Sequence, residues 1–373
     1  MQVTTPFLNQ VDPEFWRSKR VFVTGHTRFQ GSWLCLWLQY LGAQVTGYAI
    51  APRCSTSLFT VARVADGMTS IMGDPCQVPQ LTQAMIASQP EIVLHIAEKS
   101  PESPAVSGLV DQRQRKIDRE TMAVIEAVQQ ASAQAPVRSL VILTADDDLT
   151  ANITTGKITT ATAANTQGQL RRVGVAMATI HSRPGIGGGD DNLDRLVPQV
   201  IWALDTEQAA VLPNPQTIDT WLHVLESLNG VLLLAERLYA EGAAFAETFR
   251  LGGDARHCET GGAIATQLYK LWGRTEPWQR TPILAEGYTS AAPMLDASNA
   301  RDRLGWRIVL DLNTSLKWLV DWSKAVQSGA DGRSLSLRQI GDFMALTQAS
   351  QYQRTLADVA RDPAMMQRFR FCC

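Results

Sequence analysis

The sequence predicts an α/β protein in which a doubly wound parallel sheet is followed by a smaller C-terminal α/β lobe. Through about residue 205, short apolar and β-branched runs alternate with segments of helical periodicity. This alternation is typical of parallel strands joined by helical crossovers. A glycine turn at residues 25–31 joins the first predicted strand to the first helix. Beyond residue 206 the pattern changes to short strands, turns and helices, which predicts a separate lobe.

The first unit of the predicted sheet consists of a strand at residues 20–24, the glycine turn, a helix from residue 32 and a second strand at residues 44–50. Apolar residues recur at helical spacing up to Leu41, and Gly42 is placed to end the helix. In such a unit the N–H groups at the start of the helix bind the pyrophosphate of a dinucleotide. We therefore expect a Rossmann-type fold.

The later elements continue the alternation. The remaining predicted strands cover residues 68–72, 91–97, 139–144 and 173–180, with helices at 58–64, 78–88, 116–134 and 193–204. Three parts are expected: a sheet domain at 1–205, a smaller lobe at 206–333 whose chain is interleaved with the sheet domain, and a helical tail at 334–373. A polar stretch at residues 347–353 predicts that the tail is broken into two helices.

Composition excludes several classes of protein. The 373 residues are 45% hydrophobic, which is ample for a large core, and the net charge of -2 gives no indication of nucleic-acid binding. No apolar run approaches the ~20 residues that a membrane span needs. The N-terminal residues lack a signal-peptide pattern, and the six cysteines lack metal-ligand spacing. These features favour a cytoplasmic protein with free thiols and no metal site.

The glycine turn departs from a dinucleotide fingerprint at its middle position. Arg28 stands where a glycine would let the backbone approach phosphate, and its guanidinium would itself occupy a phosphate site. The loop after the second strand has no acidic residue to hold the ribose hydroxyls. Arg53 in that loop would favour a 2′-phosphate, although a solvated loop arginine is the simpler interpretation.

Several short segments are characteristic of one family. They are KRVFVTGH at residues 19–26, GSWL at 31–34, PEIVLH at 90–95, IGGGD at 186–190, DRLVP at 194–198, WLHVLE at 221–226 and LWG at 271–273. Together they resemble the extended short-chain dehydrogenase/reductase superfamily and, within it, the CDP-glucose 4,6-dehydratases. The resemblance covers roughly residues 11–340.

The resemblance implies a reaction with a nicotinamide cofactor as a temporary hydride store. The sugar's 4-hydroxyl is oxidised, water is lost across C5 and C6, and the hydride returns to C6. A tyrosine takes the hydroxyl proton, and a lysine four residues later lowers that tyrosine's pKa. Relatives also pair through two long helices, but the second of these is shortened here, so a dimer is left open.

The implied catalytic residues are largely missing. No tyrosine lies between Tyr48 and Tyr239, and the interval that should carry Tyr-x-x-x-Lys holds a single lysine, Lys157. At the end of the strand that carries the family's acid and base, Ala145 replaces a hydroxyl residue and Asp147 replaces a lysine. Only Asp146 matches, as a general acid, and a loop cap is its simpler role.

The resemblance also assigns binding positions. The implied cofactor residues are Gly25, Phe29, Gln30 (in place of a lysine), Gly31 and Asp74, and the implied substrate residues are Thr144, Arg195 and His223. Asp219 stands where an arginine for the nucleotide's phosphates is expected. This reversal of charge is expected to repel a sugar nucleotide.

We therefore predict a protein that has kept the dehydratase fold, has lost the activity and serves as a binding or scaffold protein. No tightly bound cofactor is expected, and NAD or NADP would bind only if the ancestral site is retained. The alternative is an active sugar-nucleotide lyase, dehydratase or epimerase in which Asp146, Asp147 or Glu98 supplies the acid or base. A protein partner of unknown identity would use residues 98–115 or the C-terminal helices.

Overall fold

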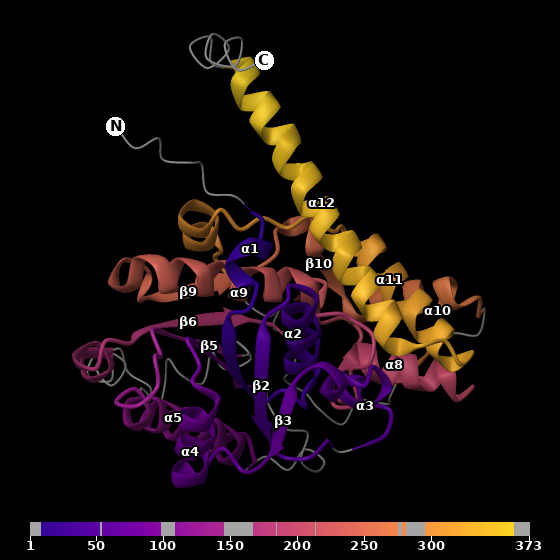
Figure 1. Cartoon of the computed structure of the whole chain (residues 1–373). Coiled ribbons are helices and arrows are strands. Elements are labelled where there is room, and N and C mark those ends of the chain that lie inside the picture. The colour runs from indigo at the N-terminus through magenta and orange to yellow at the C-terminus, as the bar shows by residue number, and fades with distance from the viewer. Residues whose placement is uncertain are drawn as a thin grey trace.

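The computed structural model describes residues 9–52, 54–97, 109–144, 167–183, 185–212, 214–274, 278–280 and 295–361. Within these ranges a seven-stranded sheet has the order β3-β2-β1-β4-β5-β6-β9, and all its neighbouring strands pair in parallel (Figure 1). The predicted doubly wound parallel sheet is confirmed. The strand order reverses between β1 and β4, and such switch points are where α/β sheets bind ligands.

The sheet is formed by β1 (Arg20–Thr24), β2 (Gln44–Ala49), β3 (Thr69–Met72), β4 (Ile92–Ala97), β5 (Ser139–Thr144), β6 (Ala176–Ser182) and β9 (Thr248–Leu251). Strands β4 and β5 are almost fully buried. Because both faces of these strands are covered, their sequences are continuous apolar runs and do not alternate between apolar and polar residues.

Helices cover both faces of the sheet. One face packs against α4 (Val78–Ser88) and α5 (Leu109–Ala131), and the other against α2 (Phe29–Tyr40) and α9 (Val224–Glu241). Helix α12 (Gly332–Arg361) packs on the outer side of α2. The helix α12 runs past the body of the protein in Figure 1. It is continuous, so the predicted break at residues 347–353 is wrong. That stretch holds no glycine or proline, and the backbone N–H of Asn9 donates to the Gln351 side chain at 3.0 Å.

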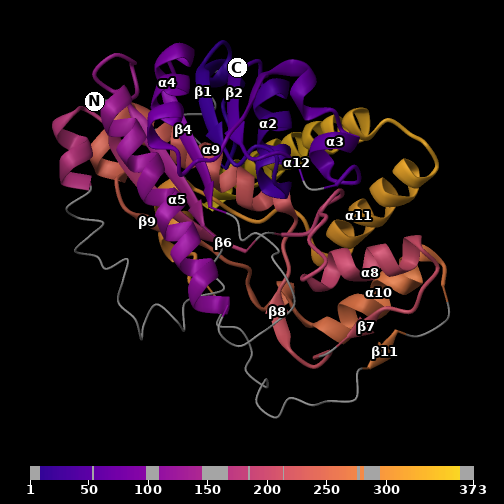
Figure 2. The ribbon, with the colours of Figure 1, turned by 90° about the horizontal axis from the view of Figure 1, so that it is seen from below.

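The smaller lobe lies beside the sheet, as Figure 2 shows. Its core joins α8 (Leu196–Asp205), α10 (Gly261–Trp272) and α11 (Leu312–Gln327). Its short strands are β7 (Val211–Leu212), β8 (Ile218–Thr220), β10 (Cys258–Thr260) and β11 (Gln279–Arg280). The short helices α1 (Pro13–Trp16) and α3 (Leu58–Val61) pack instead in the core around the sheet and α2. The chain crosses between the two parts, since β9 follows β8 in sequence but joins the main sheet.

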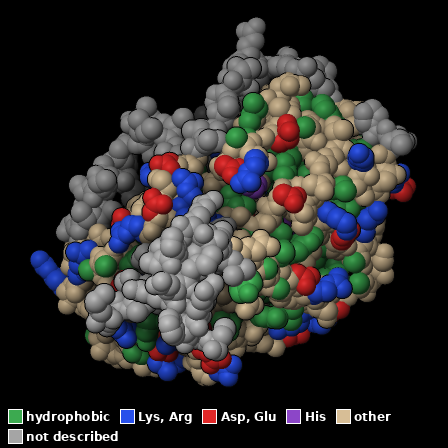
Figure 3. Space-filling model, turned by 90° about the horizontal axis from the view of Figure 1, so that it is seen from above, with side chains coloured by type: hydrophobic (Ala, Val, Ile, Leu, Met, Phe, Trp, Pro, Cys, Tyr) green, Lys and Arg blue, Asp and Glu red, His purple; other side chains and the backbone are tan. Residues whose placement is uncertain are grey.

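Among the described side chains on the face seen in Figure 3, basic and acidic groups are interspersed with apolar ones. In the described part of the chain, no helix is long and apolar enough to cross a bilayer. Nor do the described His, Cys, Asp and Glu side chains form a group of three or more that would hold a metal ion.

Helix α9 carries two buried glutamates that fasten distant segments. Glu226 accepts hydrogen bonds from the N–H groups of Val309 and Leu310, both at 2.8 Å, and burial raises its pKa to about 8. Glu236 accepts from the N–H of Asp12 and the indole of Trp16, and burial raises its pKa to about 8 as well. Both side chains are therefore protonated at neutral pH in the folded protein.

The first prediction concerns Gly31, where an added Cβ would overlap the carbonyl oxygen of Gly25. We expect Gly31→Ala to lower the free energy of unfolding by about 1–3 kcal/mol, because the start of α2 must move away from the turn. Gly168→Ala is the matched control, since a Cβ there meets nothing within 4 Å. Urea unfolding of both variants measures the difference, and equal midpoints for Gly31→Ala and wild type would contradict the packing described.

The second prediction concerns pH. In the unfolded chain the Glu226 carboxyl has its ordinary pKa of 4.5 and loses its proton near that pH, whereas the folded protein keeps the proton to about pH 8. The folded state binds more protons in this window, so the free energy of unfolding falls as pH rises from about 4.5 to about 8. Glu226→Gln keeps an acceptor oxygen and cannot ionise, so we expect a shallower fall. Chemical unfolding across this range measures it, with the exposed Glu14→Gln as control; an unchanged slope in Glu226→Gln would refute the assignment.

Candidate functional site

The turn between β1 and α2 has the geometry of a dinucleotide-binding turn. Gly25 has a φ of +84°, which side-chain-bearing residues rarely adopt, and a Cβ there would lie 2.8 Å from the carbonyl oxygen of Ile96. Gly31 packs directly on Gly25. Arg28 is the N-cap residue of α2, and its side chain makes no capping hydrogen bond. The long cation therefore stands at the helix end where the N–H groups bind anions.

The predicted cofactor side chains lie in different environments. Phe29 and Gln30 are buried within the first turn of α2, and Phe29 belongs to the apolar core. Asp74 is exposed and accepts a hydrogen bond from the backbone N–H of Cys76 at 2.9 Å, which closes a turn. Of these three, Asp74 alone presents a polar group to solvent.

Two buried histidines support the turn. His26 lies against Ser70, with 2.7 Å between its Nε2 and the Ser70 hydroxyl. His95 on β4 bridges the hydroxyls of Thr24, at 2.7 Å, and Thr121, at 3.1 Å. Burial lowers the pKa of each imidazole to about 4, so both are neutral at physiological pH. His26 thus links the turn to β3, and His95 links β1 to α5.

Thr144 ends β5, and the sheet register places His181 of β6 beside it and Arg250 of β9 beside His181. Burial and the neighbouring Arg250 lower the pKa of His181 to about 4. His181 was missed in the sequence, where its only signal was a position at the end of a predicted strand. Asp146, the predicted general acid, lies outside the described residues. The same holds for Ala145, Asp147, Lys157, Glu98 and Arg53.

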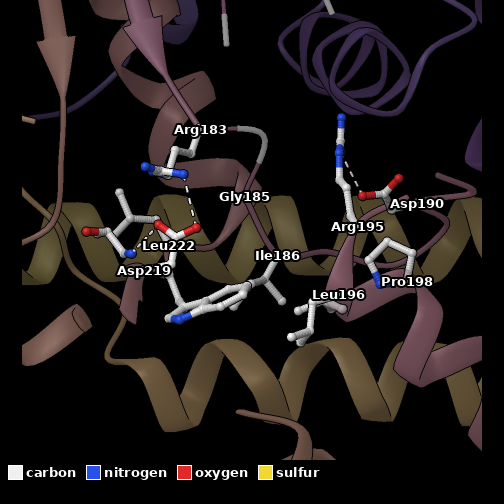
Figure 4. Close-up of a pocket in the computed structure, with 12 residues that line it drawn as sticks. Arg183, Gly185, Ile186, Asp190, Arg195, Leu196, Pro198, Asp219 and Leu222 are labelled. Carbon is white, nitrogen blue, oxygen red and sulfur yellow. Dashed lines mark hydrogen bonds and ion pairs between the residues drawn. The ribbon is translucent and has the colours of Figure 1, made fainter. Parts of the chain in front are cut away.

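A cavity of about 200 Å³ opens where the carboxyl end of β6 meets the smaller lobe (Figure 4). Its lining combines four charged side chains with an apolar wall: Arg183, Asp190, Arg195, Asp219, Gly185, Ile186, Leu196, Val197, Pro198, Thr220, Trp221 and Leu222. We call this cavity the ion-pair cleft. It includes two positions that the sequence pointed to, Arg195 and Asp219.

Two ion pairs stand on opposite sides of the ion-pair cleft in Figure 4. A guanidinium N–H of Arg183 donates to Asp219 at 3.0 Å, and one of Arg195 donates to Asp190 at 2.8 Å. Both arginine side chains are 19% exposed, and those of Asp219 and Asp190 are 27% and 6% exposed. The structure therefore shows Asp219 compensated by an arginine 36 residues earlier in the chain.

The remaining implied substrate residue, His223, lies in the core. Its Nδ1 accepts the backbone N–H of Leu225 at 3.3 Å and so caps α9. Its ring packs edge-on against Trp33 and Trp318, and burial lowers its pKa to about 3. The sequence signal for a cap, a polar residue immediately before an apolar helical run, was available.

Contacts with three helices fix the loop at residues 185–189, which precedes Asp190 in the lining of the cleft. The indole N–H of Trp33 on α2 donates to the carbonyl oxygen of Gly188 at 3.1 Å. A Cβ on Gly188 would overlap Trp322 of α11, and a Cβ on Gly189 would lie 2.7 Å from Leu58 of α3. Glycines are thus required because three helices approach the backbone of this loop. Asp190, which follows it, is fixed relative to all three.

Comparison with known proteins identifies relatives. No family model matches the chain. It is 31% identical over 363 residues to CDP-glucose 4,6-dehydratase of Salmonella typhimurium, covering 90% of this chain and 99% of the relative. Among solved structures, UDP-glucose 4-epimerase from Stenotrophomonas maltophila, with bound NAD and a sugar nucleotide, superimposes with a TM-score of 0.63 at 17% identity over 84% of this chain and all of that one. dTDP-glucose 4,6-dehydratase from Bacillus anthracis, in complex with NAD, gives a TM-score of 0.62 at 14% identity over 84% and 98%.

Proposed function

The chain belongs to the family of the CDP-glucose 4,6-dehydratases, among the sugar-nucleotide dehydratases and epimerases, and from that premise we propose that it binds a ligand in the ion-pair cleft without catalysing dehydration. It is a pseudoenzyme in this proposal. A scaffold role towards a protein partner is compatible with it. The family fold and the cleft are kept, and the chemistry is lost.

The observation that carries the proposal is the interval between β5 and β6. Residues 145–175 contain no tyrosine and a single lysine, Lys157. Oxidation of an alcohol requires a base that takes the hydroxyl proton while hydride leaves. His181 is the titratable side chain nearest Thr144 in the sheet register, and a pKa of about 4 makes it a weak base. His181 therefore does not replace the missing tyrosine as the proton acceptor.

The ion pairs of the cleft support the same proposal. Arg183 and Arg195 each donate to a carboxylate of the protein, so both guanidiniums are already neutralised. A diphosphate there would meet guanidiniums whose positive charge is already balanced by a carboxylate of the protein. It would therefore gain less than from guanidiniums without such a partner.

The residues at the turn do not fit a tightly bound nicotinamide dinucleotide. Arg28, at the N-cap of α2, adds a Cβ and a guanidinium where the backbone would approach the pyrophosphate. The chain leaves β2 through Ile50, Ala51 and Pro52, which supply no carboxylate for ribose hydroxyls.

The third prediction is the direct test of function. We expect no 6-deoxy-4-keto sugar from CDP-glucose and NAD, because the proton acceptor is missing. Proton NMR of the C6 methyl group follows the product, and the Salmonella relative assayed in parallel is the positive control. Turnover by this protein would overturn the proposal and favour the alternative, an enzyme with a different acid and base near Thr144 and His181.

The fourth prediction concerns the cofactor. Protein purified under native conditions and then denatured with acid is expected to release far less than one NAD or NADP per chain. Arg28→Gly restores a small residue at the phosphate approach, so it should bind added NAD more tightly than wild type in calorimetric titration. Arg63→Gly, at an exposed arginine, is the control. Stoichiometric nicotinamide released from the wild type would show that the turn still accepts the dinucleotide.

A further inference from the structure

We propose that the ion-pair cleft selects an uncharged, polyhydroxylated ligand about the size of one sugar ring over a nucleotide diphosphate, and that Asp219 sets this preference by neutralising Arg183. The inference deepens the proposed function and rests on it, because it names the class of ligand for the same cleft. Asp219 is thus a specificity-determining residue.

Charge balance is the first argument. The cleft presents two arginines and two aspartates, each arginine bonded to one aspartate at 3.0 Å or less. Glu259 of β10 lies directly opposite Asp219 of β8 in the strand pairing but is not among the residues that line the cavity. Among the described lining residues, an incoming diphosphate would meet as many negative as positive groups. An uncharged ligand meets no such repulsion.

Geometry holds Asp219 in this arrangement. One carboxylate oxygen accepts the N–H of Thr220 at 2.6 Å, and the other accepts from Arg183 at 3.0 Å. Arg183 follows the end of β6, whereas Asp219 lies on β8, so the pair joins the sheet to the smaller lobe. Both side chains are more than two-thirds buried, which weakens solvent screening of the pair.

Size and wall chemistry are the second argument. The cavity of about 200 Å³ is smaller than the ~300–1,000 Å³ of sites for drug-sized ligands, so the described part of the cleft suits a small molecule. Ile186, Leu196 and Trp221 provide an apolar wall for the C–H faces of a sugar ring. The paired guanidiniums and carboxylates in the lining offer donors and acceptors, which is what hydroxyl groups require.

The fifth prediction tests the role of Asp219. Asp219→Asn removes the negative charge that neutralises Arg183, so we expect CDP to bind at least about tenfold more tightly to the variant than to wild type. Asp66→Asn is the matched control, because Asp66 forms an exposed pair with Arg63 outside the cleft. Calorimetric titration with CDP measures the affinities. Asp219→Ser is a second variant of the same charge change, and thermal unfolding confirms that each variant is folded.

The second arm uses D-glucose as the neutral probe. Saturation-transfer NMR should detect glucose on wild-type protein, with the signal reduced in Trp221→Ala. Equal CDP affinities for wild type and both folded Asp219 variants, or no glucose signal on wild type, would overturn the inference. These outcomes are distinct from failure of the proposed function, which is turnover of CDP-glucose by the wild type.

Discussion

The close approach of two glycines at the start of α2 is the constraint on which much of the structure depends. Gly31 has no room for a side chain because the carbonyl of Gly25 lies against it, and this contact seats α2 on the sheet. Once α2 is seated, Trp33 reaches the carbonyl of Gly188 and holds the loop before Asp190. Packing at the turn between β1 and α2 therefore also shapes the cleft that lies beside the smaller lobe.

Two kinds of buried polar group reinforce this framework. Neutral histidines link neighbouring elements through hydroxyl and backbone hydrogen bonds, as His95 does between β1 and α5. Protonated glutamates on α9 fasten segments that are far away in sequence. Burial keeps these histidine and glutamate side chains uncharged, so the interior avoids the cost of an unpaired charge. Their polar atoms still form hydrogen bonds.

The sheet could be predicted because the signals for its strands and helices lie in short, continuous stretches of the sequence. Apolar runs, the glycine turn and the spacing of helices fix the strands within a few residues of their observed positions, and the parallel arrangement follows from the crossovers. The continuous α12 could not be foreseen from a polar stretch alone, because its conformation is supported by contacts with distant residues such as Asn9. The pairing of Arg183 with Asp219 has no local signal either, since it depends on how two parts of the fold meet. Asp190, the partner of Arg195, is closer in the sequence, since it lies five residues earlier at the end of the glycine loop.

The pair of Arg183 and Asp219 also has an evolutionary consequence. Each residue now sets the cost of changing the other: losing the aspartate leaves a partly buried cation, and losing the arginine leaves two facing carboxylates on neighbouring strands. Substitutions at the two positions are therefore epistatic. Exchanging this pair for another one residue at a time would therefore pass through an intermediate of lower stability.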